Sequence, residues 1–383
     1  MSIPARTFTR AWHATAGTAV VLLVGCSEPE RHASPSLRSI LGGTDGADAG
    51  FARAEKIREF VFPRDHGPHP AYRSEWWYLT AVVSTARTAQ VEAREFGIQF
   101  TLFRQGLEAR PGEGPAAGDG PNAWRTGQGY MAHVALSDVA ARRHLAAERF
   151  SRGHPALAGA RTGPFRVYLD DWRLQSTADD FSPLRLTTAT AGFSADLVLT
   201  ATRPAILQGE GGLSRKGPDN ASYYYSLPRI EARGELVVGG SRYAVSGLAW
   251  IDREWSTSVL GTDYLGWDWF AFHFDDGRDL MLYQLRRLDG RTDDYNAGSL
   301  GDGRVSRTLT ADDFSLAPIE YWHGWPVAWK LELRGTEPQQ YVIRAAIKDQ
   351  LMDTSVRYWE GVAHLEDGAG RRRGAGYMEL TGY

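Results

Sequence analysis

Apolar and polar residues alternate along most of the chain from about residue 75 onward. Alternation with a period of two is typical of β-strands that bury one face. The clearest alternating faces are Phe96, Ile98, Phe100 and Leu102; Tyr130, Ala132, Val134 and Leu136; Trp267, Trp269, Ala271 and His273; and Trp329, Leu331 and Leu333. Turn-forming clusters separate the runs, for example Asp275-Asp276-Gly277. The pattern predicts an all-β protein of antiparallel hairpins, closed as a sandwich or barrel.

Two segments interrupt the alternation. Residues 105–127 carry six Gly and three Pro, which predicts a long loop of the kind that is usually functional or disordered. Residues 137–149 lack a clear period of two and favour a short helix.

The chain of 383 residues is longer than one barrel needs, so two β units are expected. The predicted boundary between the two units lies in the least structured segment, near residues 229–240. Residues 235–240 resemble one arm of a hairpin, and a new series of strands begins at Tyr243. The predicted domains are 56–235 and 236–383.

The first 25 residues have the pattern of a secretory signal. Arg6 and Arg10 precede an apolar stretch over residues 14–24, and Gly25 and Cys26 follow it. The stretch is too short for a membrane span of about 20 apolar residues. A cysteine at this place resembles a bacterial lipobox, which predicts lipidation of Cys26 and cleavage before it. The alternative is an ordinary signal peptide with an incidental cysteine.

Residues 26–55 are rich in small, polar and charged residues, and the stretch is expected to act as a flexible tether. Together with a lipidated Cys26, it predicts an exported protein anchored by lipid to the periplasmic face of a membrane.

Composition excludes several classes of protein. A single Cys rules out a disulfide scaffold and a Cys-rich zinc module. A formal charge of −3 without a Lys/Arg cluster argues against a nucleic-acid partner. The 13 Trp are an unusual number, which suits either a β-rich core or an apolar binding cavity.

Several separated blocks resemble the carotenoid 1,2-hydratase family, also called hydroxyneurosporene synthase, and its AttH-like lipocalin-type relatives. The blocks are FPRDHGPH (62–69), SEWWY (74–78), AHVALSD (132–138), SRKG (214–217) with ASYYYS (221–226), GLAWIDREWS (247–256), GWDWF (266–270), YWEG (358–361) and GYMELTGY (376–383). They cover nearly all of the chain beyond the tether.

The resemblance implies two lipocalin-like antiparallel β-barrel domains in tandem. Some members of the family hydrate carotenoids, while the wider family is described as secreted hydrolases or as components linked to ABC transporters. Two interpretations therefore stay open. The first is a cofactor-independent hydratase of an apolar, isoprenoid or lipid-like alkene, and the second is a carrier of such a ligand beside an ABC-type exporter.

Hydration of an isolated alkene needs an acid, stabilisation of a carbocation and a placed water. Strand alternation puts Asp268 on one face with Phe270 and Phe272, where burial would keep its carboxyl protonated. Asp268 is therefore the first candidate for a general acid. A carboxylate that caps a turn or pairs with an arginine is the alternative.

A second pair of carboxyls lies in the segment from residue 250 to 255. In an extended segment Trp250, Asp252 and Glu254 share a face and Arg253 points the other way. Two carboxyls about 6–7 Å apart could share a proton or divide acid and water-activating roles. An ion-paired network that locks the two domains together is the alternative.

Aromatic rings are expected to line the ligand cavity, because their faces can also stabilise a carbocation. The predicted ligand-binding residues are Trp77, His133, Tyr225, Trp250, Trp255, Trp267 and Trp269. For His133 a purely structural role is the alternative, and for Tyr223–Tyr225 it is plain strand packing.

The segment Asp65-His66-Gly67-Pro68-His69 suggests metal ligands, yet Gly-Pro makes a turn and no third ligand is suitably spaced. We therefore predict no metal, and expect hydrogen bonds that hold the entry to residues 75–78. The sequence has no Gly-x-Ser-x-Gly elbow and no nucleotide-binding glycine motif, so no cofactor is predicted.

Overall fold

The computed structural model describes residues 48–383 except 90, 110–125, 259 and 336. The predicted signal, Cys26, most of the tether and most of the 105–127 loop lie outside the described residues. The described part is all-β apart from one 3-10 helix, η1 (Arg64–His66). In this part of the chain, no helix has the length and apolarity to cross a membrane.

The first antiparallel sheet has 13 strands. Its main path runs β4-β3-β2-β1-β13-β12-β9-β8-β7-β6-β5, and β10 and β11 pair with β12. The strands are β1 (Ser74–Ser84), β2 (Glu95–Gly106), β3 (Gln128–Asp138), β4 (Arg143–Arg152), β5 (Ala158–Arg161), β6 (Arg166–Leu169), β7 (Trp172–Ser176), β8 (Leu184–Ala189), β9 (Phe193–Ala201), β10 (Ile206–Leu207), β11 (Leu213–Arg215), β12 (Ala221–Val238) and β13 (Ser241–Ser256).

The second antiparallel sheet has 10 strands in the order β17-β16-β15-β14-β23-β22-β20-β19-β18, with β21 beside β22. The strands are β14 (Tyr264–Phe274), β15 (Asp279–Arg287), β16 (Ala297–Gly301), β17 (Ser306–Thr310), β18 (Phe314–Trp322), β19 (Trp325–Leu333), β20 (Gln339–Ala345), β21 (Leu351–Asp353), β22 (Arg357–Asp367) and β23 (Arg372–Thr381).

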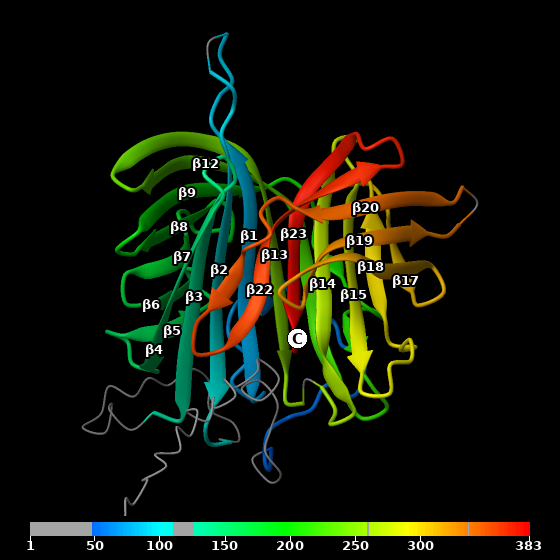
Figure 1. Ribbon diagram of the computed structural model, residues 1–383. Coiled ribbons are helices and arrows are strands. Elements are labelled where there is room, and N and C mark those ends of the chain that lie inside the picture. Colours follow the sequence, from blue (N-terminus) through cyan, green and yellow to red (C-terminus); the bar gives the residue numbers. More distant parts are fainter. Residues whose placement is uncertain (1–47, 90, 110–125, 259, 336) are drawn as a thin grey trace, which may run out of the picture. The chain divides into compact units, whose positions relative to one another are not determined.

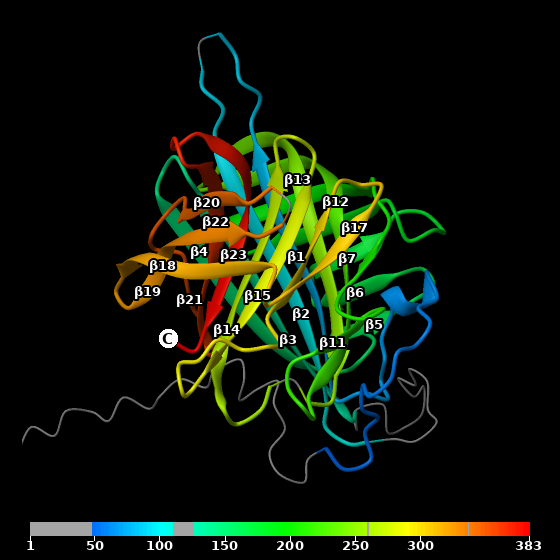
Figure 2. The same cartoon turned by 90° about the vertical axis from the view of Figure 1, so that its right-hand side faces the viewer.

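Both sheets curl, as Figures 1 and 2 show. In the first sheet β6 contacts β2, β3 and β4, so the sheet turns back on itself as a near-barrel. The second sheet forms a half-barrel. The outer faces of the two sheets meet where β1 contacts β23, β2 contacts β22 and β4 contacts β21. The predicted class, all-β with two lipocalin-like units, is confirmed.

Strand alternation divides the apolar side chains among three main places. The predicted faces of β2 and β3 lie in the core of the first sheet, and the predicted face of β19 lies in the core of the second. A third cluster fills the contact between the sheets and includes Tyr78, Tyr224, Trp250 and Trp269. Each central strand thus buries both faces, one in its own core and one between the sheets.

The helix predicted for residues 137–149 is wrong. β3 continues to Asp138, and β4 begins at Arg143 and pairs with β3 from Asp138↔Arg143 to Gly129↔Arg152. Pairing at the edge of a sheet outweighs the weak helical preference of this Ala- and Arg-containing segment.

The predicted joint near residues 229–240 is a hairpin within the first sheet. Gly239 and Gly240 adopt φ of 57° and 85°, which suits a tight two-residue turn between β12 and β13. Both arms belong to the first sheet, so the chain changes sheet later, between Ser256 and Tyr264.

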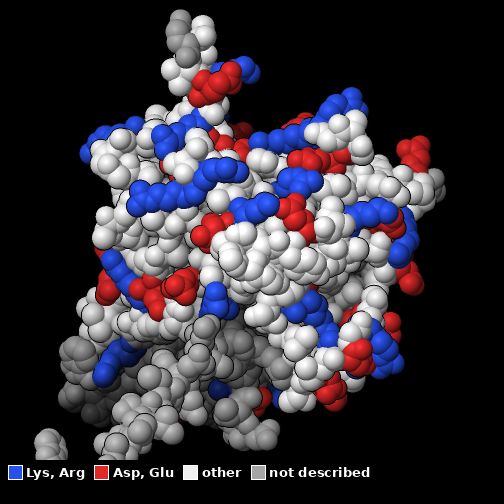
Figure 3. All heavy atoms as spheres, viewed as in Figure 1, with Lys and Arg blue, Asp and Glu red and all other residues white. Residues whose placement is uncertain are grey.

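The end of the predicted tether packs on the body. Ala54 is buried, and the amide of Ala52 donates a 2.8 Å hydrogen bond to the carbonyl of Ala71. On the face drawn in Figure 3, basic and acidic side chains of the described residues are interspersed.

Candidate functional site

β13 presents its acidic residues to the second sheet. Asp252 and Glu254 stand on the outer face with Trp250, whereas Arg253 points into the first core and bonds Glu75 at 2.7 Å. The prediction that Trp250, Asp252 and Glu254 share one face of the strand and Arg253 the other is confirmed. β13 is flanked by β1 and β12, which places Tyr78 and Ser226 beside Asp252.

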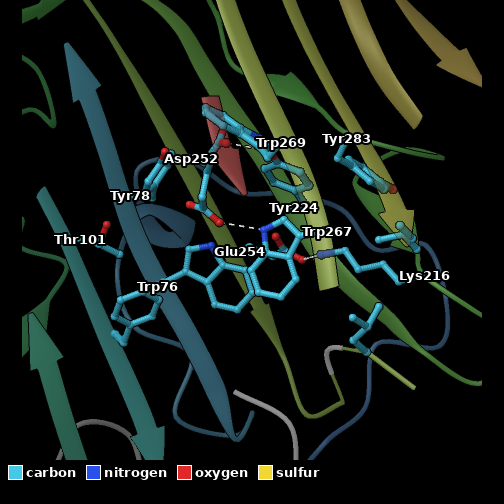
Figure 4. Close-up of a pocket in the computed structure, with 14 residues that line it drawn as sticks. Trp76, Tyr78, Thr101, Lys216, Tyr224, Asp252, Glu254, Trp267, Trp269 and Tyr283 are labelled. Atoms are coloured by element: carbon cyan, nitrogen blue, oxygen red, sulfur yellow. Dashed lines mark hydrogen bonds and ion pairs between the residues drawn. The ribbon is translucent and has the colours of Figure 1, made fainter. Parts of the chain in front are cut away.

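A cavity lies in front of these carboxyls, between the outer faces of the sheets (Figure 4), and its space of about 680 Å³ includes the part that is open to solvent. Its lining combines aromatic rings with charged groups. The first sheet and the segments joined to it contribute Trp76, Tyr78, Thr101, Phe103, Lys216, Tyr224, Asp252, Glu254 and Leu260. The second sheet contributes Trp267, Trp269, Tyr283, Leu285 and Glu379.

Asp252 is a buried carboxyl held by three donors. Its oxygens accept hydrogen bonds from Ser226 Oγ at 2.5 Å, Tyr224 Oη at 2.7 Å and Trp250 Nε1 at 2.7 Å. Burial raises the pKa of Asp252 to about 7, although these three bonds oppose the rise. The group is therefore partly protonated near neutral pH, and its conjugate base has donors already in place.

Glu254 is ion-paired within the same cavity. Its carboxylate contacts Lys216 Nζ and accepts a 2.5 Å hydrogen bond from Ser222 Oγ. Lys216 Nζ lies 5.8 Å from the ring centroids of both Trp76 and Tyr224, within range of a cation–π interaction. Both partners of this ion pair line the cavity.

Glu379 is a cavity carboxyl that the sequence analysis did not select. It lies on β23 opposite Trp269, and its Oε1 accepts a 2.7 Å hydrogen bond from Trp267 Nε1. Burial raises the pKa of Glu379 to about 7; Asp252 and Glu254 add to the rise, while Trp267 and Lys216 oppose it. Its signal in the sequence was the alternation Tyr377-Met378-Glu379, which puts Glu379 on the outer face.

A further buried carboxyl lies behind the cavity. Glu360 on β22 stands directly opposite Glu379 and is 1% exposed. Burial and the neighbouring Glu379 raise the pKa of Glu360 well above its ordinary value, and the phenols of Tyr78 and Tyr358 beside it lower it. The space between the sheets therefore concentrates carboxyls that hold protons at neutral pH.

The predicted aromatic residues divide between this cavity and the first core. Trp267 and Trp269 line the cavity, and Trp269 Nε1 donates to Tyr224 Oη at 3.1 Å. Trp250 shares the outer face but supports Asp252 from behind the lining. The remaining three, Trp77, Tyr225 and Trp255, belong to the core of the first sheet.

Asp268 lies on the other face of β14 and is absent from the cavity lining. It is fully buried and accepts bonds from Arg286 Nε at 3.2 Å, Gln284 Nε2 at 2.8 Å and Tyr383 Oη at 2.8 Å. Burial raises the pKa of Asp268, and Arg286 opposes the rise. Asp268 thus forms an ion pair with an arginine, which was the alternative to its role as a general acid.

The segment with His66 and His69 forms hydrogen bonds at the entry to β1, as expected. His69 Nδ1 lies 2.8 Å from Glu75 Oε1, and Nε2 lies 3.3 Å from Asp65 Oδ1. Two arginines, Arg104 and Arg253, hold Glu75 from the core side and lower its pKa. Over the described ranges no cluster of His, Cys, Asp and Glu is arranged to hold a metal ion.

His133 does not line the cavity. It is fully buried between the sheets, where its Nδ1 lies 2.9 Å from Tyr358 Oη and its ring packs edge-on against Phe103. Its Nε2 lies 3.5 Å from Glu148 Oε2.

Residues 53–383 match the family model described as AttH-like. A crystal structure of an AttH candidate from Nitrosomonas europaea is 34% identical, with a TM-score of 0.73, and the match covers 87% of this chain and all of that one. No protein in the curated set of sequences matches the chain significantly.

Two more distant solved structures share the fold. Kievitone hydratase from Nectria haematococca is 16% identical with a TM-score of 0.61, over 87% of this chain and 95% of that one. CghA in complex with Sch210972 is 13% identical with a TM-score of 0.50, over 87% and 96% of the two chains. At these identities the likeness concerns the fold.

Proposed function

This chain belongs to the AttH-like family, and from that premise and the cavity between the sheets we propose that it is a cofactor-independent hydratase of an apolar alkene. The observation that carries the proposal is a pair of carboxyls, the buried Asp252 and the partly buried Glu379, which come from different sheets and face one aromatic cavity. Both have a pKa raised to about 7. Near neutral pH such a pair holds one protonated and one ionised carboxyl.

Asp252 is the proposed acid. The protonated carboxyl gives its proton to one alkene carbon, and the electron pair of the double bond forms the new C–H bond. The carboxylate that remains is stabilised by its donors Ser226, Tyr224 and Trp250. The other carbon becomes a tertiary cation, which the ring faces of Trp267 and Trp269 stabilise.

Glu379 is the proposed base. Its carboxylate takes a proton from water as the water oxygen bonds to the cationic carbon, so one water is added across the double bond. Glu254 is less suited to this role, because its carboxylate is already engaged by Lys216 Nζ and Ser222 Oγ. Kievitone hydratase has the same fold, and its name is consistent with this chemistry.

We also propose that the protein works at a membrane surface. The signal-like amino terminus and Cys26 support export and lipid anchoring, and the apolar cavity supports an isoprenoid or lipid-like substrate. Cys26 favours a second candidate function as well, that of an exported carrier which hands an unmodified ligand to an ABC-type exporter.

One experiment separates the two functions. Purified protein lacking residues 1–47 is incubated with lycopene, and the products are analysed by mass spectrometry. Gain of one water, lost about 100-fold or more in Asp252→Asn, supports the hydratase. Lycopene recovered bound and unchanged from wild-type protein supports the carrier and overturns the hydratase for this substrate.

A further inference from the structure

The charged side chains that line the cavity are unequally divided in sign. Asp252, Glu254 and Glu379 carry carboxyls, whereas Lys216 carries an ammonium group. Most of the other lining residues are aromatic. A cavity of this composition attracts positive charge more strongly than negative charge.

The ammonium group of Lys216 shows how the cavity holds a cation of its own. Its Nζ contacts the carboxylate of Glu254. It lies 5.8 Å from the ring centroids of Trp76 and Tyr224 and 5.9 Å from that of Tyr283. The three rings belong to β1, β12 and β15, so both sheets surround this nitrogen. A carboxylate beside aromatic faces is therefore a combination that already binds an ammonium group in this cavity.

The other two carboxyls of the cavity are held by neutral donors. Asp252 accepts hydrogen bonds from two hydroxyls and an indole, and Glu379 accepts one from the indole of Trp267. Among the described residues, neither carboxyl has a Lys or Arg as an ion-pair partner. A cation brought into the cavity would thus stabilise carboxylates that no basic side chain of the described chain neutralises.

The groups suited to such a cation are accessible. Trp76, Trp267 and Glu379 line the cavity, and each of them is partly exposed (Figure 4). Asp252 is buried more deeply, at 3% exposure. A ligand that enters from solvent therefore meets two indoles and one carboxyl before it reaches the second carboxyl.

We propose that the cavity binds an organic cation, with a substituted ammonium nitrogen against the indoles of Trp76 and Trp267 and beside the carboxylate of Glu379. The apolar body of this ligand occupies the remaining aromatic lining, and Asp252 supplies a second negative charge. The site goes beyond the proposed hydratase function and needs no turnover. In a hydratase the same groups would face the transient carbocation, so a stable ammonium ion of similar shape would act as an inhibitor.

The protonation of the carboxyls agrees with this ligand class. The pKa of Asp252 and that of Glu379 are both raised to about 7, so ionising them near neutral pH requires little free energy. Glu254 adds to both shifts, and Lys216 opposes that of Glu379. A bound cation relieves the repulsion among the three carboxyls, whereas a bound anion would increase it.

The test compares two ligands of the same shape. Benzyltrimethylammonium and neopentylbenzene differ only by a charged nitrogen in place of a carbon. Their affinities for the purified full chain are measured by equilibrium dialysis at neutral pH. We expect benzyltrimethylammonium to bind at least about tenfold more tightly than neopentylbenzene.

Two variants locate the charged group within the cavity. Glu379→Gln should reduce the preference for the cation to about twofold or less, with neopentylbenzene affinity within about twofold of wild type. Trp267→Leu removes a ring face but keeps an apolar side chain, and it should reduce the preference about fivefold. The second variant keeps the test decisive if the first does not fold.

Glu148→Gln is the matched control. The Glu148 side chain is also partly exposed, at 23%, but it does not line the cavity and is held by the amide and hydroxyl of Ser355. The preference for benzyltrimethylammonium should remain at the wild-type value in this variant. An equal loss in Glu148→Gln and Glu379→Gln would mean that the cation binds by general surface charge, which overturns the site.

The remaining outcomes are also distinct. Equal affinities of the two ligands in wild type overturn the cation site, as does a preference that persists in both Glu379→Gln and Trp267→Leu. A preference for the cation in a protein that never adds water to lycopene supports the site and counts against the hydratase alone. Hydration of lycopene without any preference for the cation overturns the site and leaves the hydratase standing.

Discussion

The indole nitrogen of Trp267 donates a 2.7 Å hydrogen bond to Glu379, and both side chains line the cavity between the two sheets. This hydrogen bond links an aromatic side chain of the cavity lining to one of the cavity carboxyls. The cavity itself lies between the outer faces of the two sheets. The interior of each curled sheet is occupied by its own apolar core. The proposed ligand site therefore lies between the lipocalin-like units.

Glu379→Gln should stabilise the protein at neutral and alkaline pH. The pKa of Glu379 rises from 4.5 to about 7 in the folded state, so the folded protein binds more protons than the unfolded chain in this window. Stability is undiminished below about pH 4.5 and falls as pH rises towards 7. Above about pH 7 the variant should gain about 3 kcal/mol in unfolding free energy, at roughly 1.4 kcal/mol per pKa unit.

Urea unfolding at a series of pH values measures this effect. Glu92→Gln is the control, because the Glu92 side chain is 80% exposed. A wild-type and Glu379→Gln difference that does not change between acid and neutral pH would contradict the raised pKa.

Asp268→Asn should leave lycopene hydration within about threefold of wild type, while Asp252→Asn loses it. Asp268 faces the core of the second sheet and bonds Arg286, so its loss leaves a partly buried arginine without its carboxylate. The expected cost is about 3–5 kcal/mol in unfolding free energy. Turnover lost in Asp268→Asn at a temperature where the variant remains folded would return the acid role to Asp268.

Sequence alternation and the turn-forming clusters between the runs predicted the strands, although the central strands bury both faces. Alternation also predicted correctly that Trp250, Asp252 and Glu254 lie on the same face of their strand. Alternation alone does not say which face of a strand meets a cavity. Trp255 was expected in the ligand site, yet its odd position puts it with Arg253 in the first core.

The roles of Asp268 and Glu379 depend on which faces of the two sheets pack against each other. Asp268 shares its face with Phe270 and Phe272 as predicted, but that face is the second core and not the cavity. Glu379 lines the same cavity as Asp252, about 130 residues away in the sequence, because β23 contacts β1 of the first sheet. Local periodicity carries no information on such long-range pairing.

Cys26→Ala should move the protein from the membrane fraction to the soluble periplasmic fraction. The expected lipid anchor is attached at this thiol, and the sequence elsewhere has no stretch of about 20 apolar residues. Fractionation with immunodetection, with and without globomycin, measures the change. An unaltered membrane fraction in Cys26→Ala would remove the lipoprotein interpretation.

Trp267→Ala and Trp255→Ala should have opposite signatures. Trp267 is half-buried and lines the cavity, so its loss removes a ring face and a donor to Glu379. Binding of retinol, followed by its fluorescence, should weaken about tenfold, equivalent to about 1.4 kcal/mol. Trp255 is fully buried and stacks on His69 with ring centroids 3.7 Å apart. Its removal should cost about 3–5 kcal/mol of unfolding free energy and leave retinol affinity near wild type. If Trp255→Ala weakens retinol binding more than Trp267→Ala while remaining folded, the ligand lies inside the first sheet and not between the sheets.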